Sequence, residues 1–491
     1  MLDLPFDNSF AREMDGFFVP WEGAQVPDPH VLRLNRGLAA ELGVQADGLD
    51  TPEGAAVLSG AVAPKGGHPL AMAYAGHQFG GFSPQLGDGR ALLLGEIVTP
   101  GGARVDLHLK GSGKTPFSRG GDGKAVLGPV LREYLFGEAM HALGIPTTRA
   151  LAATTTGEMI DRAGPEPGAV LARVAASHLR VGTFQFFAAR GQTDEVRQLA
   201  DYAIARHDPD LADRPNRYLE MFGRVRDRQA ALVAQWMAVG FVHGVMNTDN
   251  STISGETIDY GPCAFIDAYD PAAVYSSIDM QGRYAYGRQP SILQWNLARL
   301  AETLVDVIEA EDQDDAVRQL TNEVGVFTAR YETAWLAAMR AKMGLEPGGD
   351  DAEDQQIITS FLAILVAARV DFTQAFRALS DVVRGEREPL WALFEERSAI
   401  TEWLFRFNAR GARDGADAGE RAAAMDRVNP VYIPRNHKVE EALAAARDGD
   451  MTPFDTLLDR VSTPFERVAG AEAYEAPAPE SFGRHVTFCG T

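Results

Sequence analysis

The chain has 491 residues, 45% of them hydrophobic and 23% charged, a composition typical of a globular protein with room for two or three lobes. Its formal net charge of −22 argues against a general nucleic-acid-binding or anionic-membrane surface, so a polyphosphate site would have to be a local basic pocket. The two cysteines, Cys263 and Cys489, exclude a disulfide scaffold and a four-cysteine zinc site.

The N-terminal sequence MLDLPFDNSFAREM has no basic segment followed by an apolar one, so no secretory signal is predicted. The most apolar run, residues 357–370, is too short to span a bilayer and predicts a buried helix. We therefore expect a cytoplasmic protein that binds neither nucleic acid nor membranes.

The first elements lead into a glycine-dense loop. Residues 29–42 predict a helix, and the glycine-dense stretch 74–90 precedes a strand over 91–97. Glycines let backbone N–H groups approach phosphates closely, which makes Arg90 a candidate for a phosphate or base contact. A turn-rich loop without a ligand is the alternative, because glycine spacing alone is a weak signal.

The segment 105–110, VDLHLK, alternates apolar and polar residues and predicts a strand with one face toward a core. Lys110 stands at its end, where a protein kinase keeps its phosphate-binding lysine. Asp106 and His108 are expected to lie at the surface with their hydrogen bonds satisfied, rather than to act in catalysis. A second basic, glycine-rich loop over 111–128 follows directly, and we expect nucleotide contact there rather than an exposed linker.

Residues 129–143 predict a helix that opens with proline. Glu133 lies one turn in and 133 − 110 = 23 residues after Lys110, a plausible distance for a Lys–Glu ion pair across a strand, a loop and a helix. A surface glutamate is the alternative for any single helical Glu.

Further strands are predicted over 149–156 and 169–175, and two arginines accompany the second. Arg173 lies within this apolar strand and Arg180 shortly after it, where a buried guanidinium needs an anionic partner. We expect phosphates to be that partner; carboxylates are the alternative.

The chain then becomes helical. Residues 276–290 are polar and glycine-punctuated, like an activation or substrate loop, 411–419 predicts a linker, and 429–436 is extended before a last helix. The predicted helices cover residues 194–206, 218–222, 226–241, 291–310, 315–342 and 355–378.

The stretch His243–Asp267, HGVMNTDNSTISGETIDYGPCAFID, carries two acidic motifs. β-Branched pairs on either side of Ser254-Gly255-Glu256 predict a hairpin that brings Asn250 and Asp259 together. Amide and carboxylate oxygens are ligands that Mg²⁺ accepts while it keeps waters and substrate phosphates. For the Asp249-Asn250 pair taken alone, a β-turn or a helix cap would be the simpler interpretation.

This stretch can be aligned with the protein-kinase pattern H-R-D-x-x-x-x-N followed by D-F-G. His243 and Asn250 match the His and Asn, and Asp259 opens D-Y-G at the position of D-F-G. The kinase catalytic base is replaced by Val245, which cannot accept a proton. Asp249, next to the candidate metal ligand Asn250, is then the available carboxylate.

Together these segments resemble the selenoprotein O family, protein-kinase-like adenylyltransferases once called pseudokinases. The resemblance rests on the order and number of blocks spread over most of the chain. The blocks are YAGHQFGGFSPQLGDGRALLLGE, LKGSGKTPFSRGGDG, LGIPTTRAL, MNTDN, TIDYGPCAF, GRYAYGRQP with QWNL, and NPVYIPRN.

The resemblance implies an α+β fold with two kinase-like lobes, a mixed β N-lobe and a mainly helical C-lobe, followed by a helical C-terminal extension. The expected bounds are 1–180, 181–345 and 346–491. The implied activity is transfer of AMP from ATP to Ser, Thr or Tyr hydroxyls of proteins, with the nucleotide flipped relative to kinases so that the α-phosphorus faces the acceptor. UMP transfer from UTP, γ-phosphoryl transfer and a non-catalytic nucleotide-binding regulator are the alternatives.

The resemblance also implies residue roles. Lys110 and Glu133 form the ion pair, Asp249 is the base, and Asn250 and Asp259 bind Mg²⁺ or Mn²⁺. The nucleotide is contacted by Gly87, Gly89, Arg90, Lys110, Asp122, Gly123, Arg173, Arg180 and Asp259. Cys489 lies where animal members carry selenocysteine, and a tail disulfide would pair it with Cys263; from spacing alone we expect one buried thiol and one tail thiol.

Overall fold

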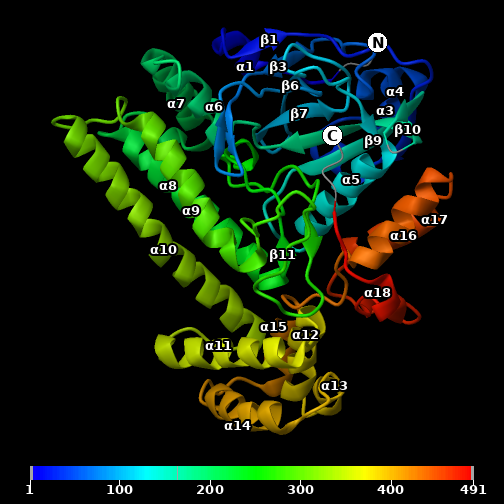
Figure 1. Cartoon of the computed structure of the whole chain (residues 1–491), viewed down its shortest axis with the longest axis vertical. Helices are drawn as coiled ribbons and strands as arrows, with labels where there is room; N and C mark the ends of the chain where they lie inside the picture. Colours follow the sequence, from blue (N-terminus) through cyan, green and yellow to red (C-terminus); the bar gives the residue numbers. More distant parts are fainter. Residues whose placement is uncertain (1–3, 163, 488–491) are drawn as a thin grey trace.

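The computed structural model describes residues 4–162 and 164–487 and shows an α+β protein, as predicted. A sheet lies at one end and most helices lie below and beside it (Figure 1). All pairings in this sheet are antiparallel. Its spatial order is β1 (Phe18–Pro20), β3 (Leu70–Met72), β6 (Ala91–Val98), β7 (Arg104–Lys110), β10 (Pro165–Ala175), β9 (Arg149–Asp161) and β2 (His30–Leu34), with β8 (Ala125–Val126) also paired to β10.

The two faces of the sheet belong to different cores. Leu107 and Leu109 of β7 pack with the short helices α2 (Arg36–Glu41), α3 (Ala46–Leu49) and α4 (Pro52–Leu58), as the alternation of this strand predicts. The opposite face packs on α5 (Leu127–Ala142). Lys110 and Arg173 project from this second face, on adjacent strands.

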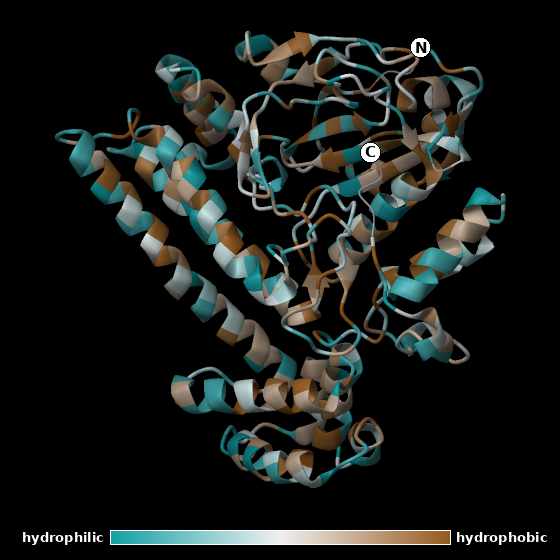
Figure 2. Ribbon diagram, viewed as in Figure 1, coloured by the Kyte–Doolittle hydropathy of each residue, from teal (hydrophilic) through white to brown (hydrophobic). Residues whose placement is uncertain are grey.

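Three long helices run beside one another below the sheet: α8 (Arg217–Val239), α9 (Gln289–Leu304) and α10 (Gln313–Met343) (Figure 1). α10 carries hydrophilic and hydrophobic residues along its whole length (Figure 2), as expected of a helix with one packed face. The shorter helices α6 (Val181–Ala188) and α7 (Thr193–His207) connect this layer to the sheet.

A second helical core follows in the chain. It contains α11 (Asp351–Ala368), α12 (Phe372–Val383), α13 (Glu388–Trp391), α14 (Ser398–Ala412) and α15 (Ala418–Asp426). The chain then returns, and α16 (Asn436–Arg447) and α17 (Thr452–Ser462) pack on α5. The remaining elements are α1 (Ser9–Glu13), β4 (Gly76–Gln78), β5 (Gly81–Ser83), β11 (Phe241–Val242), β12 (Ala264–Phe265), α18 (Glu472–Glu475) and short 3₁₀ turns.

Three helix predictions need correction. The separate helices expected over 218–222 and 226–241 are one continuous helix, α8. The segment 29–42 begins as the edge strand β2, paired with β9, and only its second half is helical. The predicted helix 355–378 is two helices, because Arg369 adopts a left-handed conformation (φ 53°) at the end of α11. The side chain of Asp371 then accepts a hydrogen bond from the backbone N–H of Gln374 and starts α12.

The hairpin predicted between Ser251 and Ile258 does not form. Thr252 pairs instead with Arg180, and Thr257 pairs with Thr147. The Thr252 hydroxyl donates to the carbonyl of Glu256, so the loop is closed by a side chain rather than by a strand ladder. β-Branched residues favour extended backbone, but the partner they find is decided by tertiary packing.

The surface position expected for Asp106 and His108 is also wrong. Their side chains are 2% and 0% exposed, because α7 and the loop after β10 cover this face of β7. Arg206 of α7 donates to Asp106 at 2.6 Å, so this buried carboxylate has a hydrogen-bond partner inside the protein. Within residues 4–162 and 164–487, no helix has both the length and the apolarity needed to cross a membrane.

Candidate active site

Five charged side chains meet below the end of β7, and we call them the charge cluster: Lys110, Glu133, Arg173, Arg180 and Asp259. Lys110 Nζ lies 2.6 Å from Glu133 and 2.5 Å from Asp259. Arg173 contacts the same two carboxylates at 2.9 Å and 2.7 Å, and Arg180 reaches the second oxygen of Asp259 at 3.1 Å. The Lys–Glu pair expected from the sequence is present.

The fold explains why these residues meet. Lys110 pairs with Leu171 across β7 and β10, so Arg173 stands two residues along the neighbouring strand on the same face. β8 leads directly into α5, and Glu133 lies in the second turn of that helix. Arg180 ends the connection from β10 to α6. Only Asp259 comes from the helical part of the chain.

Asp259 is held by its surroundings in an uncommon backbone conformation, with φ of 65°. His243 is buried and its Nε2 bonds to the carbonyl of Ile258, which anchors the preceding residue. On the other side, the buried Tyr260 bonds through its hydroxyl to Thr147. Asp259 is thereby fixed between two anchored neighbours.

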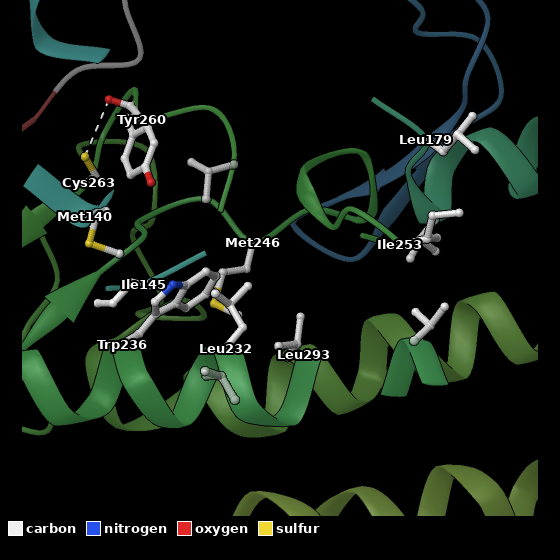
Figure 3. Packing of buried hydrophobic residues seen from close by; sticks show 14 of the residues in the cluster. Met140, Ile145, Leu179, Leu232, Trp236, Met246, Ile253, Tyr260, Cys263 and Leu293 are labelled. Carbon is white, nitrogen blue, oxygen red and sulfur yellow. Dashed lines mark hydrogen bonds between the residues drawn. The ribbon is translucent and has the colours of Figure 1, made fainter. Parts of the chain in front are cut away.

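The segment that carries Asp249 and Asn250 is anchored by hydrophobic packing. Met246 is buried among hydrophobic side chains that include Leu232 and Trp236 of α8 (Figure 3). Trp236 also donates from Nε1 to the hydroxyl of Thr257, two residues before Asp259. Both acidic motifs therefore rest on the same face of one long helix.

The charge cluster has three cations and two carboxylates, a surplus of one positive charge in a chain of net charge −22. Burial alone would raise the pKa of Asp259, but Lys110, Arg173 and Arg180 hold it well below its usual range. Against the same burial, Lys110 and Arg173 also lower the pKa of Glu133. Both acids are therefore ionised at neutral pH.

Asp249 lies in the short turn Thr248–Asn250 and is 8% exposed. Its Oδ2 accepts a hydrogen bond from Gln78 at 3.3 Å, whereas its buried Oδ1 has no partner among residues 4–162 and 164–487. Burial raises the pKa of Asp249 to about 6, although Arg180 nearby lowers it. A buried carboxylate with a free oxygen and a raised pKa is suited to accept a proton.

Asn250 is oriented by one hydrogen bond, from its Nδ2 to the carbonyl of Val245 at 3.0 Å. The bond uses the amide nitrogen, so the amide oxygen is the atom available to a cation. In the described part of the chain, His, Cys, Asp and Glu side chains form no group of three or more that could hold a metal ion. A site made of Asn250 and Asp259 would thus depend on waters and phosphates for its other ligands, as Mg²⁺ sites often do.

A cavity of about 300 Å³ opens over the charge cluster, and its lining includes both Asp249 and Asn250. A second cavity of about 430 Å³ adjoins it and shares Arg90 and Lys110. Its wall includes the apolar side chains of Val126, Val130 and Leu443. Charged side chains line both cavities, and the second adds apolar wall to the shared lining.

The glycine loops expected to contact a nucleotide also line the first cavity: Gly87, Gly89, Arg90, Asp122 and Gly123. Gly123 has a φ of +71°, and a Cβ there would lie 2.2 Å from the carbonyl oxygen of Gly113, so only glycine fits. Asp122 is paired with Arg162, with contacts at 2.9 Å and 3.0 Å, which ties this loop to the end of β9.

Every site residue predicted from the sequence lines this cavity except Glu133, which lines the adjoining one. For Arg173 and Arg180, carboxylates are the partners observed, the alternative that the sequence left open. Arg180 also keeps a buried Nε that has no hydrogen-bond partner in the described part of the chain, and it packs 4.6 Å over the ring of Tyr74.

Sequence reasoning missed two contributors from the segment before β5. Tyr74 packs on Arg180, and Gln78 contacts Asp249. Both belong to the glycine-dense block already singled out, but their partners lie 180 − 74 = 106 and 249 − 78 = 171 residues further along the chain, and such distant contacts leave no local signal in the sequence. Cys263 is buried, as expected of one of the two thiols, and burial raises its pKa to about 12; Cys489, the disulfide partner that the resemblance implies, lies outside the described residues.

Comparison with known proteins assigns the chain to a family. A family model described as protein adenylyltransferase SelO matches residues 1–462. The chain belongs to the SelO family. A protein nucleotidyltransferase YdiU of Cereibacter sphaeroides is 59% identical over 488 residues, which cover 99% of both chains.

Two further relatives with the same name support the SelO assignment. One from Mycobacterium sp. is 56% identical over the full length of both chains, and one from Rhodococcus jostii is 55% identical over 99% of this chain and 94% of its own length. The SelO family and these relatives are nucleotidyltransferases by description, so the enzyme class expected from the sequence is confirmed.

Proposed function

We propose that this enzyme transfers the adenylyl group of ATP to Ser, Thr or Tyr hydroxyls of proteins and releases pyrophosphate. The family description and the names of the relatives support adenylyl or nucleotidyl transfer to proteins. The position of Asp249 carries the proposal. This buried carboxylate with an unpartnered oxygen lines the same cavity as the charge cluster, whereas the residue at the kinase base position, Val245, is apolar and buried.

The cations would hold the triphosphate. Lys110, Arg173 and Arg180 line the cavity, and the Nε of Arg180 is a donor that no group of the described residues uses. Preorganised cations stabilise charge that develops on a leaving pyrophosphate without reorganising during the reaction. As the family resemblance implies, the β- and γ-phosphates would lie over these cations and the α-phosphorus would face the acceptor.

The chemical step then follows from where Asp249 lies. The acceptor hydroxyl would lose its proton to the carboxylate of Asp249 while its oxygen bonds to the α-phosphorus. The bond between the α-phosphorus and the bridging oxygen to the β-phosphate breaks, and pyrophosphate leaves with that electron pair. Arg180 donates to the backbone carbonyl of Asp249 at 2.8 Å and to Asp259 at 3.1 Å, so one guanidinium would link base and phosphate site.

A divalent cation, Mg²⁺ or Mn²⁺, would be held by the Asn250 amide oxygen and the Asp259 carboxylate. Its donor set fits a hard cation, since both ligands are oxygens and the Asn250 nitrogen is already engaged. When bound, such an ion neutralises charge on phosphate oxygens. Of the three cations that contact Asp259, Arg180 makes the longest contact, so a bound metal ion would displace Arg180 most easily.

We also propose a kinase-like arrangement of two lobes around this cavity. Residues 1–180 would form the N-lobe, 181–345 the C-lobe with the catalytic loops, and 346–491 the C-terminal extension. It is supported by the order of parts along the chain: a strand ending in Lys110, a helix with Glu133, and loops carrying Asn250 and Asp259.

The products distinguish adenylyl transfer from its alternatives. With ATP, a divalent cation and a protein acceptor, we expect pyrophosphate to appear and ADP not to appear. ADP would instead indicate a kinase, and neither product would indicate a nucleotide-binding regulator. Replacing ATP with UTP in the same assay compares adenylyl with uridylyl transfer, since the relatives' name leaves the base open.

A further inference from the structure

His108 is a buried histidine next to the charge cluster that the proposed chemistry does not use. It lies on β7, two residues before Lys110, and its side chain is 0% exposed. Across the sheet it pairs directly with Arg173. Its ring stacks on that of His178, with centroids 4.0 Å apart.

Two hydrogen bonds determine which nitrogen of His108 carries the proton. Arg173 Nε lies 3.3 Å from Nδ1, and because a guanidinium only donates, Nδ1 must be the acceptor. The proton is therefore on Nε2, which donates to the carboxylate of Asp88 at 3.2 Å. Burial lowers the pKa of His108, with Arg173 and Arg180 acting in the same direction, so the neutral ring is consistent with its surroundings.

Asp88 connects this histidine to the nucleotide loop. It stands between Gly87 and Gly89, is 1% exposed, and accepts a second hydrogen bond from the backbone N–H of Met72 at 3.0 Å. Its own carbonyl accepts a hydrogen bond from the hydroxyl of Thr115 at 2.6 Å. The turn that lines the cavity is thus fixed from behind by His108 and β3.

We propose that His108 is a positioning residue that holds the two halves of the nucleotide site in register. Through Nδ1 it fixes the Arg173 guanidinium, which contacts Glu133 and Asp259, and through Nε2 it fixes the turn that carries Gly87 and Gly89. It touches no substrate itself. The inference rests on the proposed function, because it assumes that Arg173 and this turn contact the nucleotide.

Two amide variants separate the two bonds. His108→Asn places an amide near Nδ1, so it keeps an acceptor for Arg173 and loses the donor to Asp88. His108→Gln reaches the position of Nε2, so it keeps the donor to Asp88 and leaves Arg173 Nε unpaired. We expect His108→Asn mainly to raise the KM for ATP, and His108→Gln mainly to lower kcat, each by about tenfold.

ATP binding provides a readout that does not require turnover. By titration calorimetry, the dissociation constant for ATP should rise by about tenfold in His108→Asn and by less in His108→Gln. His178→Asn serves as the matched control: it removes the stacked ring but keeps a donor for Asp106, and it should leave KM and kcat near their original values while lowering the melting temperature.

The inference is overturned if the His108 variants and the His178 control lose melting temperature alike but keep normal ATP affinity, KM and kcat, since His108 would then only fill the core. It is also overturned if the two amide variants show the same split between KM and kcat. If the unaltered protein binds ATP but forms no pyrophosphate, the proposed function fails, and the binding titrations still test the role of His108.

Discussion

Asp259 is the residue on which the cluster depends most, and Asp259→Asn keeps its shape while it removes the charge and replaces one accepting oxygen with an NH₂ group. Asparagine tolerates the left-handed backbone at φ 65°, whereas Asp259→Ala would add strain there. The carboxylate accepts contacts from three cations, and Arg180 would lose the one carboxylate that it contacts among the described residues. Removing one partner of a buried ion pair costs about 3–5 kcal/mol; we expect about 3 here because Glu133 still compensates Lys110 and Arg173.

Urea unfolding at several pH values measures this loss. The pKa of Asp259 is held well below its usual range, so its stabilisation is fully present above the pKa of the unfolded carboxyl, about 3.9, and is lost as the pH falls through the folded value. The two proteins should therefore differ most at neutral pH and converge in strong acid. An unchanged unfolding free energy at neutral pH would refute the description of the cluster.

The same variant tests the metal assignment. In the unaltered protein, Mg²⁺ should tighten ATP binding; in Asp259→Asn that effect should disappear and transfer should be lost, as it should in Asp259→Ala. Turnover that persists in either variant would show that Asp259 does not bind the metal.

Three further predictions concern the cavity. Lys110→Ala should lower turnover by about a hundredfold yet leave the protein folded, because two arginines still face two carboxylates; a collapsed melting curve would instead indicate a structural lysine. Because burial raises the pKa of Asp249 to about 6, its base form is lost as the pH falls through that value. Below that pH, kcat/KM should fall about tenfold per pH unit. A flat profile of kcat/KM between about pH 5 and about pH 8 would contradict the role of Asp249 as base. Gly123→Ala should abolish the stabilisation of the protein by ATP in a melting assay, whereas Gly120→Ala, which has positive φ but open space around its Cβ position, should keep it.

The candidate site could be predicted from the sequence because its residues lie in short local motifs. Lys110 follows an alternating strand, Glu133 lies in a helix marked by proline, and Asp249, Asn250 and Asp259 lie within 11 residues of one another. Local spacing and the family resemblance therefore identified the residues that line one cavity.

What the sequence could not predict depends on distant partners. The alternation of β7 predicts which residues share a face but not that the loop after β10 stacks His178 on His108, so it does not predict the burial of His108. For the same reason the sequence predicts one hairpin for Thr252 and Thr257, although Thr252 pairs with Arg180 and Thr257 pairs with Thr147. The end of α11 is not predicted either, because an arginine, Arg369, adopts the left-handed conformation there instead of the glycine that usually signals a helix end.

The most direct test of adenylyl transfer at Asp249 is the intact mass of a protein acceptor after incubation with the enzyme, ATP and Mg²⁺. We expect an increase equal to one adenylyl group, which is absent with Asp249→Asn even though that variant still binds ATP. An increase equal to one phosphate group, or an adenylyl adduct that persists in Asp249→Asn, would contradict the account.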